Sequence, residues 1–475
     1  MIQCPHDNSV CELRVDGRPL PQDYARSIGS VRLTTSVDAA GQLDVTMGIN
    51  DLGKGFRVLE ERILFPGTEI DVFAGYGKKL IPKGKYVVKD HDPNYTGGSV
   101  TIKAFDRLAD FLRGTDALLF EGYSRNSEVI EAMLEQNYPK WGWVLQPSPV
   151  KGGDRFKDIP DHFKPVGDTD LAYLKAMAEG DGWAYPRVWT REQYRFVEEQ
   201  LREADSPIAQ LLFSASTNLR DYNLVYLPLS DLFSFTPPLR LWHKTGTARG
   251  GDFSNLAIRF SSQDMPTGLE VYGVASDADG TRRPVKVVIE FTQAGPKQPV
   301  VTETFDSKWT RQEKIRERVS SGTALAVYAL GEGRRAVETG GEYEYMNKEG
   351  VKVKGKSQKS EAEVMYALTI QTEQDAVAYA KEWFRLRAAA YLTGSFGIAN
   401  LPGTAELDAQ QVHEIHGIAK PHVGSYIITD CVHEWSRSGG HQVSGNVQKL
   451  VEESDLPPRN TAMLEETEHV EGMGM

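Results

Sequence analysis

A strand pattern that occurs twice is the feature that most constrains how this chain of 475 residues can fold. In each copy a glycine precedes a β-branched strand, a Gly-Gly pair follows, and a second strand ends in a basic residue and leucine. The copies are residues 84–90, 97–98 and 107–108, and residues 424–430, 439–440 and 449–450, with an upstream strand at 70–75 aligned to 412–417. Each copy predicts a β-hairpin with a neighbouring strand. We therefore expect two similar small β-barrel domains in one subunit, separated by a long insertion.

Composition narrows the class of protein without naming a function. Charged residues make up 25% of the chain and hydrophobic residues 40%, values typical of a soluble globular protein. No apolar run approaches the ~20 residues that a membrane helix needs, and the first residues lack the features of a secretory signal, so we expect no membrane segment. Three cysteines, Cys4, Cys11 and Cys431, are too few for a disulfide framework and indicate a reducing compartment.

The formal net charge of −12 argues against a protein that grips nucleic acid by its phosphates. An acidic surface suits a channel along which DNA slides without sticking, because carboxylates and phosphates repel one another. The same charge also suits a protein of this size that simply stays in solution.

The periodicity of apolar residues divides the chain into six expected segments, and the fold class is mainly β with α+β inserts. Strict alternation over 43–49 predicts a half-buried strand, and helical stripes follow Ser127 and Asp168. The segments are a first β-barrel at 1–114, an α/β insert at 115–207, a crossover at 208–255, a β-rich domain with a long exposed hairpin at 256–371, a helix (372–393) and second β-barrel at 372–451, and a mobile acidic tail at 452–475.

Within the insert, we expect Ser127 to cap the first helix and the second helix to run from about residue 168 to Gly180. Short strands are expected at 141–145 and 183–185. The tryptophans of this insert, Trp141, Trp143, Trp183 and Trp189, are expected in its core, although they also suit a sugar-binding surface.

Five of the ten histidines gather near the C-terminus: His413, His416, His422, His433 and His441. A structural zinc needs three or four ligands at ~2.0–2.1 Å. Residues three apart on a strand point to opposite faces, and the others fall at a turn or on different strands, so we expect no metal here. Cys4, His6 and Cys11 form an equally loose set at the N-terminus, where we also expect no metal.

The sequence lacks the common short catalytic motifs, including the nucleophile elbow, the zinc protease helix and the phosphate-binding loop. We therefore expect no catalytic residue, no cofactor and no enzymatic activity.

The order of elements resembles the phage late control gene D family of tail baseplate hub proteins. The resemblance depends on short motifs along most of the chain: 65–67, 70–72, 75–77, Gly84, 104–108, 127–134, 167–178, 182–183, 376–391, 424–428 and 432–433. Residues 300–365 and the tail match nothing in that pattern.

The resemblance implies a homotrimer whose six barrels form a ring of pseudo-sixfold symmetry. Such a hub adapts a hexameric tail tube to a trimeric central spike and lines the DNA path without binding DNA specifically. Its partners are the tail tube protein, a central spike protein and other baseplate proteins. A late viral protein of this kind is assembled in the host cytoplasm and resides in the tail baseplate of the virion.

Three alternatives stay open at this point: the hub of a phage-like contractile injection system, a tail-associated cell-wall hydrolase, and a sugar-binding module. The host, the tail type (contractile or not) and the roles of residues 300–365 and of the tail are not fixed by the sequence.

Overall fold

The structure is a computed structural model. It describes residues 2–3, 9–48, 57–77, 79–114, 116–120, 122–123, 125–148, 162–164, 166–181, 183–203, 215–228, 240–243, 252–260, 392–401, 404–419 and 422–449, and separate strands between 268 and 366. The chain divides into two compact units, one of residues 1–149, 160–259 and 392–449, the other of residues 150–159, 260–391 and 450–475. The helix expected at 372–393 lies outside the described residues up to position 391, and its expected end is wrong because Leu392 and Thr393 belong to a strand. The acidic tail, most of the crossover, Cys4 and His6 also lie outside the described residues.

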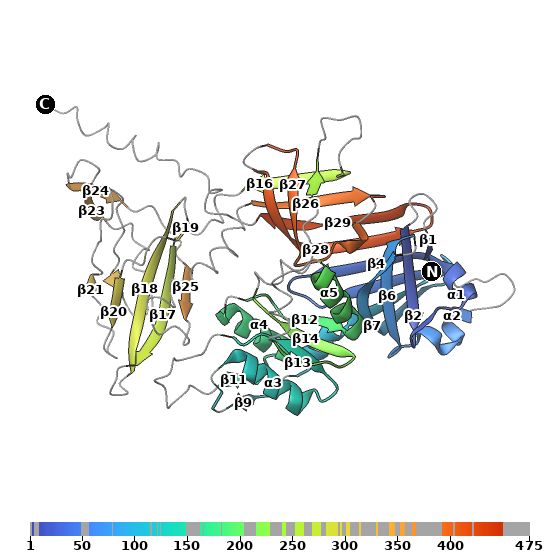
Figure 1. The fold of residues 1–475 in the computed structure, drawn as a ribbon, viewed down its shortest axis with the longest axis horizontal. Coiled ribbons are helices and arrows are strands. Elements are labelled where there is room, and N and C mark those ends of the chain that lie inside the picture. Colours follow the sequence, from blue (N-terminus) through green and yellow to red (C-terminus); the bar gives the residue numbers. More distant parts are fainter. Residues whose placement is uncertain are drawn as a thin grey trace. The chain divides into compact units, whose positions relative to one another are not determined.

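A mostly antiparallel sheet dominates the first unit, as predicted (Figure 1). Its strands follow the order β1 (Ile2–Gln3), β2 (Ser9–Val15), β6 (Glu69–Tyr76), β7 (Lys79–Asn94), β8 (Ser99–Asp106), β5 (Gln42–Gly48), β4 (Ile28–Ser36), β28 (Gly424–Ser436), β29 (Gly440–Lys449), β26 (Leu392–Ala399) and β16 (Asn255–Phe260). Three strands lie off this path: β3 (Arg18–Pro19) beside β2, β27 (Val412–His416) beside β28, and β15 (Arg240–Trp242) beside β27. We call β2, β6, β7, β8, β5 and β4 the first strand set, and β27, β28, β29, β26 and β16 the second strand set.

The pattern that occurs twice in the sequence forms two matching meanders, β6-β7-β8 and β27-β28-β29. Gly84 and Gly424 both have positive φ, +118° and +147°, a conformation that residues with a Cβ rarely adopt. The pairing with the last strand then shifts by one residue in each meander, at Lys89 and at Thr429. The two copies therefore share a glycine and a bulge at the same separation.

The strand pairing corrects the sequence alignment of the two copies by one residue. Ile70 lies opposite Tyr86, and His413 lies opposite Tyr426. Ile70 therefore corresponds to His413 and not to Val412. Because successive residues on a strand face opposite sides, a shift of one residue changes which side chains point to the core.

Two hydrophobic cores fill the strand sets, and β28 contributes to both. Its residues 424–427 pair with β27, and its residues 430–436 pair with β4. Tyr426 and Ile428 are buried in the second core, whereas Trp435 is buried in the first core. The first core also contains the alternating residues that the sequence predicted on β5: Leu43, Val45 and Met47.

The insert contains three helices, not two: α3 (Asn126–Asn137), α4 (Asp170–Asp181) and α5 (Arg191–Glu203). A sheet pairs β12 (Arg187–Thr190), β14 (Tyr222–Tyr226), β10 (Gly142–Leu145) and β13 (Ser216–Asn218), and a second pairs β9 (Leu118–Phe120) with β11 (His162–Lys164). Ser127 lies inside α3, whose N-cap is Arg125, because the Glu128 side chain accepts from the Arg125 backbone N–H in a capping box. The strand expected at 183–185 is absent; the described strand in that region is β12.

Short helices and 3₁₀ turns complete the first unit: α1 (Gln22–Ser27), α2 (Arg57–Glu60), and turns at Arg62–Leu64, Arg107–Leu112 and Thr404–Glu406. In the second unit, β17 (Gly268–Ser276), β18 (Arg282–Thr292), β19 (Gly295–Pro296), β20 (Val301–Thr304) and β25 (Glu363–Tyr366) share a sheet. Two strand pairs are separate from it, β21 (Glu313–Lys314) with β22 (Ala329–Leu330), and β23 (Glu342–Met346) with β24 (Lys352–Lys356). No helix in the described part of the chain is long and apolar enough to span a membrane.

Candidate functional site

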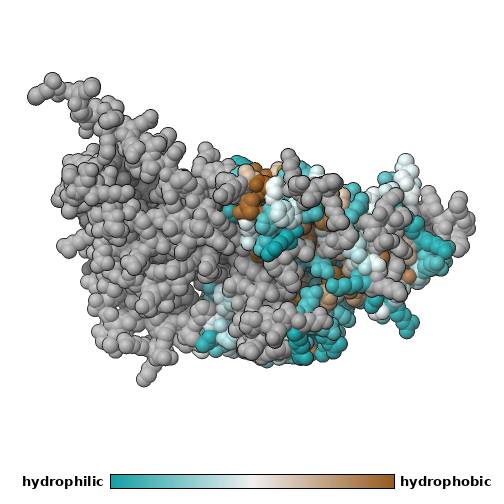
Figure 2. Space-filling view, turned by 45° about the horizontal axis from the view of Figure 1, so that its top comes forward, coloured by the Kyte–Doolittle hydropathy of each residue, from teal (hydrophilic) through white to brown (hydrophobic). Residues whose placement is uncertain are grey.

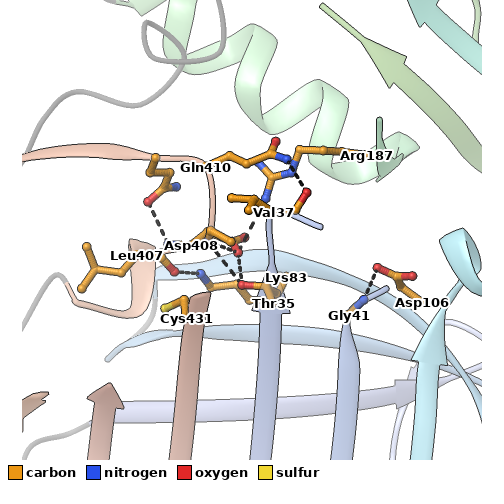
Figure 3. Close-up of polar contacts among 12 residues, drawn as sticks. Thr35, Val37, Gly41, Lys83, Asp106, Arg187, Leu407, Asp408, Gln410 and Cys431 are labelled. Atoms are coloured by element: carbon orange, nitrogen blue, oxygen red, sulfur yellow. Dashed lines mark hydrogen bonds and ion pairs between the residues drawn. The ribbon is translucent and has the colours of Figure 1, made fainter. Parts of the chain in front are cut away.

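The described residues between β26 and β27, 400–401 and 404–411, lie against the first strand set. We call them the junction segment. The Lys83 ammonium, almost fully buried, donates to the Leu407 carbonyl at 2.7 Å, and the Thr35 hydroxyl donates to the Asp408 carboxylate at 2.5 Å (Figure 3). These contacts join residues more than 300 positions apart in the sequence, so the junction segment fixes one strand set against the other.

A cavity of about 130 Å³ lies beside the junction segment, with walls from β7, β12, α5 and the junction segment itself. Arg187 of β12 enters it, and its guanidinium lies 3.8 Å from the Asp408 carboxylate. Asp106 lines the same cavity and accepts hydrogen bonds from the backbone N–H groups of Gly41 and Leu108. Burial raises the pKa of Asp106 to about 7, against the lowering effect of those two bonds and of Arg187.

Gln410 closes one side of the cavity and has a left-handed backbone, with φ of +67°. Its side-chain nitrogen donates to the carbonyls of Val37 and Tyr185, at 3.3 and 3.4 Å. Its buried side-chain oxygen has no hydrogen-bond partner within the described residues. The cavity therefore offers an arginine, a carboxyl group and an amide oxygen, but the donors and acceptors around it mostly serve to hold the junction segment.

The sequence singled out none of these cavity residues as a site, although Asp106 lies in the motif 104–108 that carries the family resemblance. They come from segments far apart in the chain, which the pairing of β4 with β28 and the contacts of β12 and α5 with β7 bring together.

A stack of aromatic rings lies at the same junction. His433 Nε2 donates to the Leu407 carbonyl at 2.8 Å, so in neutral His433 the other nitrogen, Nδ1, accepts a bond from His441 Nε2 at 3.0 Å. The His441 Nδ1 lies 2.8 Å from the Tyr76 hydroxyl, and the Trp435 indole lies parallel to both imidazoles. The rings thus connect β28 and β29 to β6 of the first strand set.

The histidines of the C-terminal region are not all separated, as the strand argument expected. His433 and His441 meet because Trp435 pairs with His441 across the hairpin, which puts His433 on the same face. The others lie apart: His413 bonds to Gln411, His416 bonds to Glu414, and the His422 carbonyl accepts from Tyr426. Among the residues that the structure describes, no three His, Cys, Asp or Glu side chains gather as metal ligands would.

Cys431 and His433 form the contact that most resembles a nucleophile and its base, with Sγ 3.5 Å from Nε2. Both are fully buried. Burial raises the pKa of the Cys431 thiol, and burial with the nearby Lys83 ammonium and His441 holds the pKa of His433 well below its ordinary value. Both groups are therefore neutral and closed to solvent, whereas cysteine catalysis needs an accessible thiolate.

The tryptophans of the insert are mostly in its core. Trp141 and Trp143 are buried with the helices α3 and α4, Trp183 packs partly buried against the same core, and Trp189 of β12 is also buried. These positions match the prediction of a packed core and leave little indole surface for sugar stacking.

No protein-family model matches the chain, and no curated protein matches it. Among solved structures it is similar to a tail protein from Neisseria meningitidis MC58, with 11% identity and a TM-score of 0.49 over 95% of this chain and 100% of that one. The 43 kDa tail protein of prophage MuSo2 from Shewanella oneidensis has 12% identity and a TM-score of 0.47, over 94% and 99%. A type VI secretion component from E. coli, with described similarity to bacteriophage T4 tail proteins, has 7% identity and a TM-score of 0.46, over 94% and 80%. Two of these three are named as tail proteins, the class to which the sequence resemblance points.

Proposed function

We propose that this chain is the structural baseplate hub of a phage tail. In this proposal each strand set is one small β-barrel, and three copies of the chain form a ring of six. The ring adapts a hexameric tail tube to a trimeric central spike, with DNA passing through its lumen without specific binding.

The matching register of the two meanders is the observation that carries the proposal. The same glycine, the same bulge and the same opposed tyrosine recur in β6-β7-β8 and β27-β28-β29. A subunit with two equivalent β-domains presents six equivalent surfaces in a trimer, which is what a sixfold neighbour requires. The formal net charge of −12 favours passage of DNA over binding.

The junction supports a structural role. The bonds from Lys83 to Leu407, from Thr35 to Asp408 and between Tyr76 and His441 join the first strand set to the junction segment and to the second strand set. We therefore propose that the chain is not an enzyme, needs no cofactor, and acts through contacts with the tail tube, the spike and other baseplate proteins of the virion.

Native mass spectrometry and electron microscopy of the full chain test this proposal, with and without the tail tube protein. We expect trimers with a central opening and six similar densities around it, and binding to the end of the tube. A stable dimer that never adopts threefold symmetry, even with the tube protein, contradicts it. A zymogram on peptidoglycan tests the hydrolase alternative, and we expect no clearing.

A further inference from the structure

The C-terminal part of strand β7 has an edge that no described strand pairs with. On the side of β6, strand pairing covers residues 79–87 of β7, and backbone hydrogen bonds with Gly67 and Thr68 reach Val88. Residues 90–94 pair with β8 alone among the described residues. The register makes Asp90 the counterpart of Asp430, since each is the first paired residue after its bulge. In β28 the corresponding part, residues 430–436, is paired on that same edge with β4.

The opposite end of the sheet has an unpaired edge as well. Gly394 of β26 pairs with Val447, just as Leu43 of β5 pairs with Ala104, so β26 is the counterpart of β5. β16 pairs with β26 and thus takes the place that β4 has beside β5. β4 continues to β28, whereas β16 ends the order of paired strands that the structure describes. Among the described strands, β7 thus lacks a neighbour of the kind that β4 provides for β28, and β16 has a side to which such a neighbour could pair.

Exposed aromatic side chains lie next to the unpaired part of β7. Asn94 pairs with Ser99 as Glu434 pairs with Gln442, so Tyr95 occupies the position of Trp435. Trp435 is fully buried in the core of the first strand set, but Tyr95 is 62% exposed. Phe65, which contacts His91 edge to face, is 46% exposed. Exposed aromatic side chains beside a strand edge that no described strand pairs with are typical of an interface.

The edge of β16 has a matching character. Leu256 and Ile258 are partly buried against the second core, while Ala257 and Arg259 are exposed. Figure 2 shows an apolar patch, on an otherwise largely hydrophilic described surface, in the region that β16 and β26 occupy. Arg259 can face the exposed Asp90 and Asp92, as exposed Arg32 lies opposite exposed Glu434 between β4 and β28.

We propose that residues 90–94 of β7 pair antiparallel with β16 of a second copy of this chain, and that Tyr95 enters that copy's second core as Trp435 enters the first core. The contact is head to tail, so successive copies extend until the ring closes. Pro93 lacks a backbone N–H, so it donates no hydrogen bond across this contact. The inference rests on the proposed function only for the number of copies, which it does not itself determine.

Cysteine cross-linking tests the contact, with Asp92→Cys and Ala257→Cys. We expect a mixture of the two single variants to form covalent dimers under mild oxidation, and each variant alone to form none beyond the wild-type chain, because a head-to-tail contact never brings two copies of one position together. A chain with both cysteines should give a ladder that ends at the closed ring. An intrachain pair, Arg32→Cys with Glu434→Cys, is the positive control for the equivalent contact.

Tyr95→Ala tests the aromatic anchor, with Leu119→Ala as the matched control, since Leu119 is 55% exposed on β9 of the insert. We expect Tyr95→Ala to raise the concentration needed for assembly at least ~10-fold with an unchanged melting temperature, and Leu119→Ala to change neither. Trimers that assemble without the 92–257 cross-link overturn this inference and leave the proposed function standing. Cross-linked copies that never adopt threefold symmetry support the contact and overturn the proposed function. If neither the cross-link nor threefold assembly is observed, this inference and the proposed function are both wrong.

Discussion

The Asp106 carboxyl makes the stability of the first unit depend on pH in a direction opposite to that of an ordinary surface carboxylate. Its pKa is raised from 3.8 to about 7, chiefly by burial. Between those values the folded protein holds a proton that the unfolded chain releases. Stability from this group is therefore full below about pH 4 and is lost as the pH rises toward 7.

Asp106→Asn removes this dependence. A pKa raised from 3.8 to about 7 corresponds to roughly 4 kcal/mol if the carboxyl is wholly buried. Because the Asp106 side chain is partly exposed at the cavity, we expect its contribution to the free energy of unfolding to fall by only ~2–3 kcal/mol between pH 4.5 and pH 8. The asparagine NH₂ also replaces an acceptor for the N–H of Gly41 or Leu108, which costs ~1–2 kcal/mol at every pH.

The measurement is the free energy of urea unfolding across this pH range, followed by tryptophan fluorescence. We expect the asparagine variant to be the less stable protein at pH 4.5 and to match or exceed the wild type at pH 8. Asp44→Asn, on the adjacent strand β5, controls for the loss of one carboxylate. A constant difference between wild type and Asp106→Asn from pH 4.5 to 8 would refute the reasoning.

Three further predictions use the same unfolding assay. Burial is the main cause that holds the pKa of His433 well below 6.5, so the folded protein excludes a proton that the unfolded chain binds, and the free energy of unfolding falls as the pH drops below 6.5. His433→Gln should reduce this fall by up to ~1.4 kcal/mol per pH unit. An unchanged slope contradicts the prediction. Gly84→Ala should lower the free energy of unfolding by ~1–3 kcal/mol because Gly84 has a positive φ. Gly29→Ala, at a glycine whose φ is not positive, should lower it less, and equal losses count against the strain argument. Lys164→Met leaves the buried Asp170 carboxylate without its cation, with the Tyr138 hydroxyl still donating to it, and should lower the free energy of unfolding by ~3–5 kcal/mol. Lys164→Met/Asp170→Leu should recover part of that loss, and no recovery would exclude the ion pair as the cause.

The sequence predicts where strands and helices lie along the chain better than it predicts which strands pair with each other. Alternation over residues 43–49 correctly identified β5 and its buried face, because a half-buried strand has apolar residues at every second position of the sequence. Helix α5 was missed although Thr190 and Gln193 carry a capping box, with each side chain bonded to the other's backbone N–H. Its largely polar residues hid the helical stripe.

The candidate site was not predictable by such patterns. The cavity residues Lys83, Asp106, Arg187 and Asp408 are ordinary charged residues in their own segments. The pairing of β4 with β28 and the contacts of β12 with β7 bring them together. The one-residue error in aligning the two copies has a similar origin. Glycines and tyrosines marked the repeat, but only the backbone pairing shows which residue of β27 stands opposite Tyr426.

Because β28 belongs to both cores, the order of synthesis has a consequence for folding. The Ser36 hydroxyl donates to Asp430, a residue 394 positions later, and Trp435 completes a core whose other strands emerge within the first quarter of the chain. A nascent chain therefore carries an incomplete N-terminal core with an open β4 edge until almost the entire protein has left the ribosome. Contacts this distant in sequence form slowly and leave strand edges exposed to other chains. Premature termination upstream of β28 should thus yield an aggregating fragment, since neither core closes without that one strand.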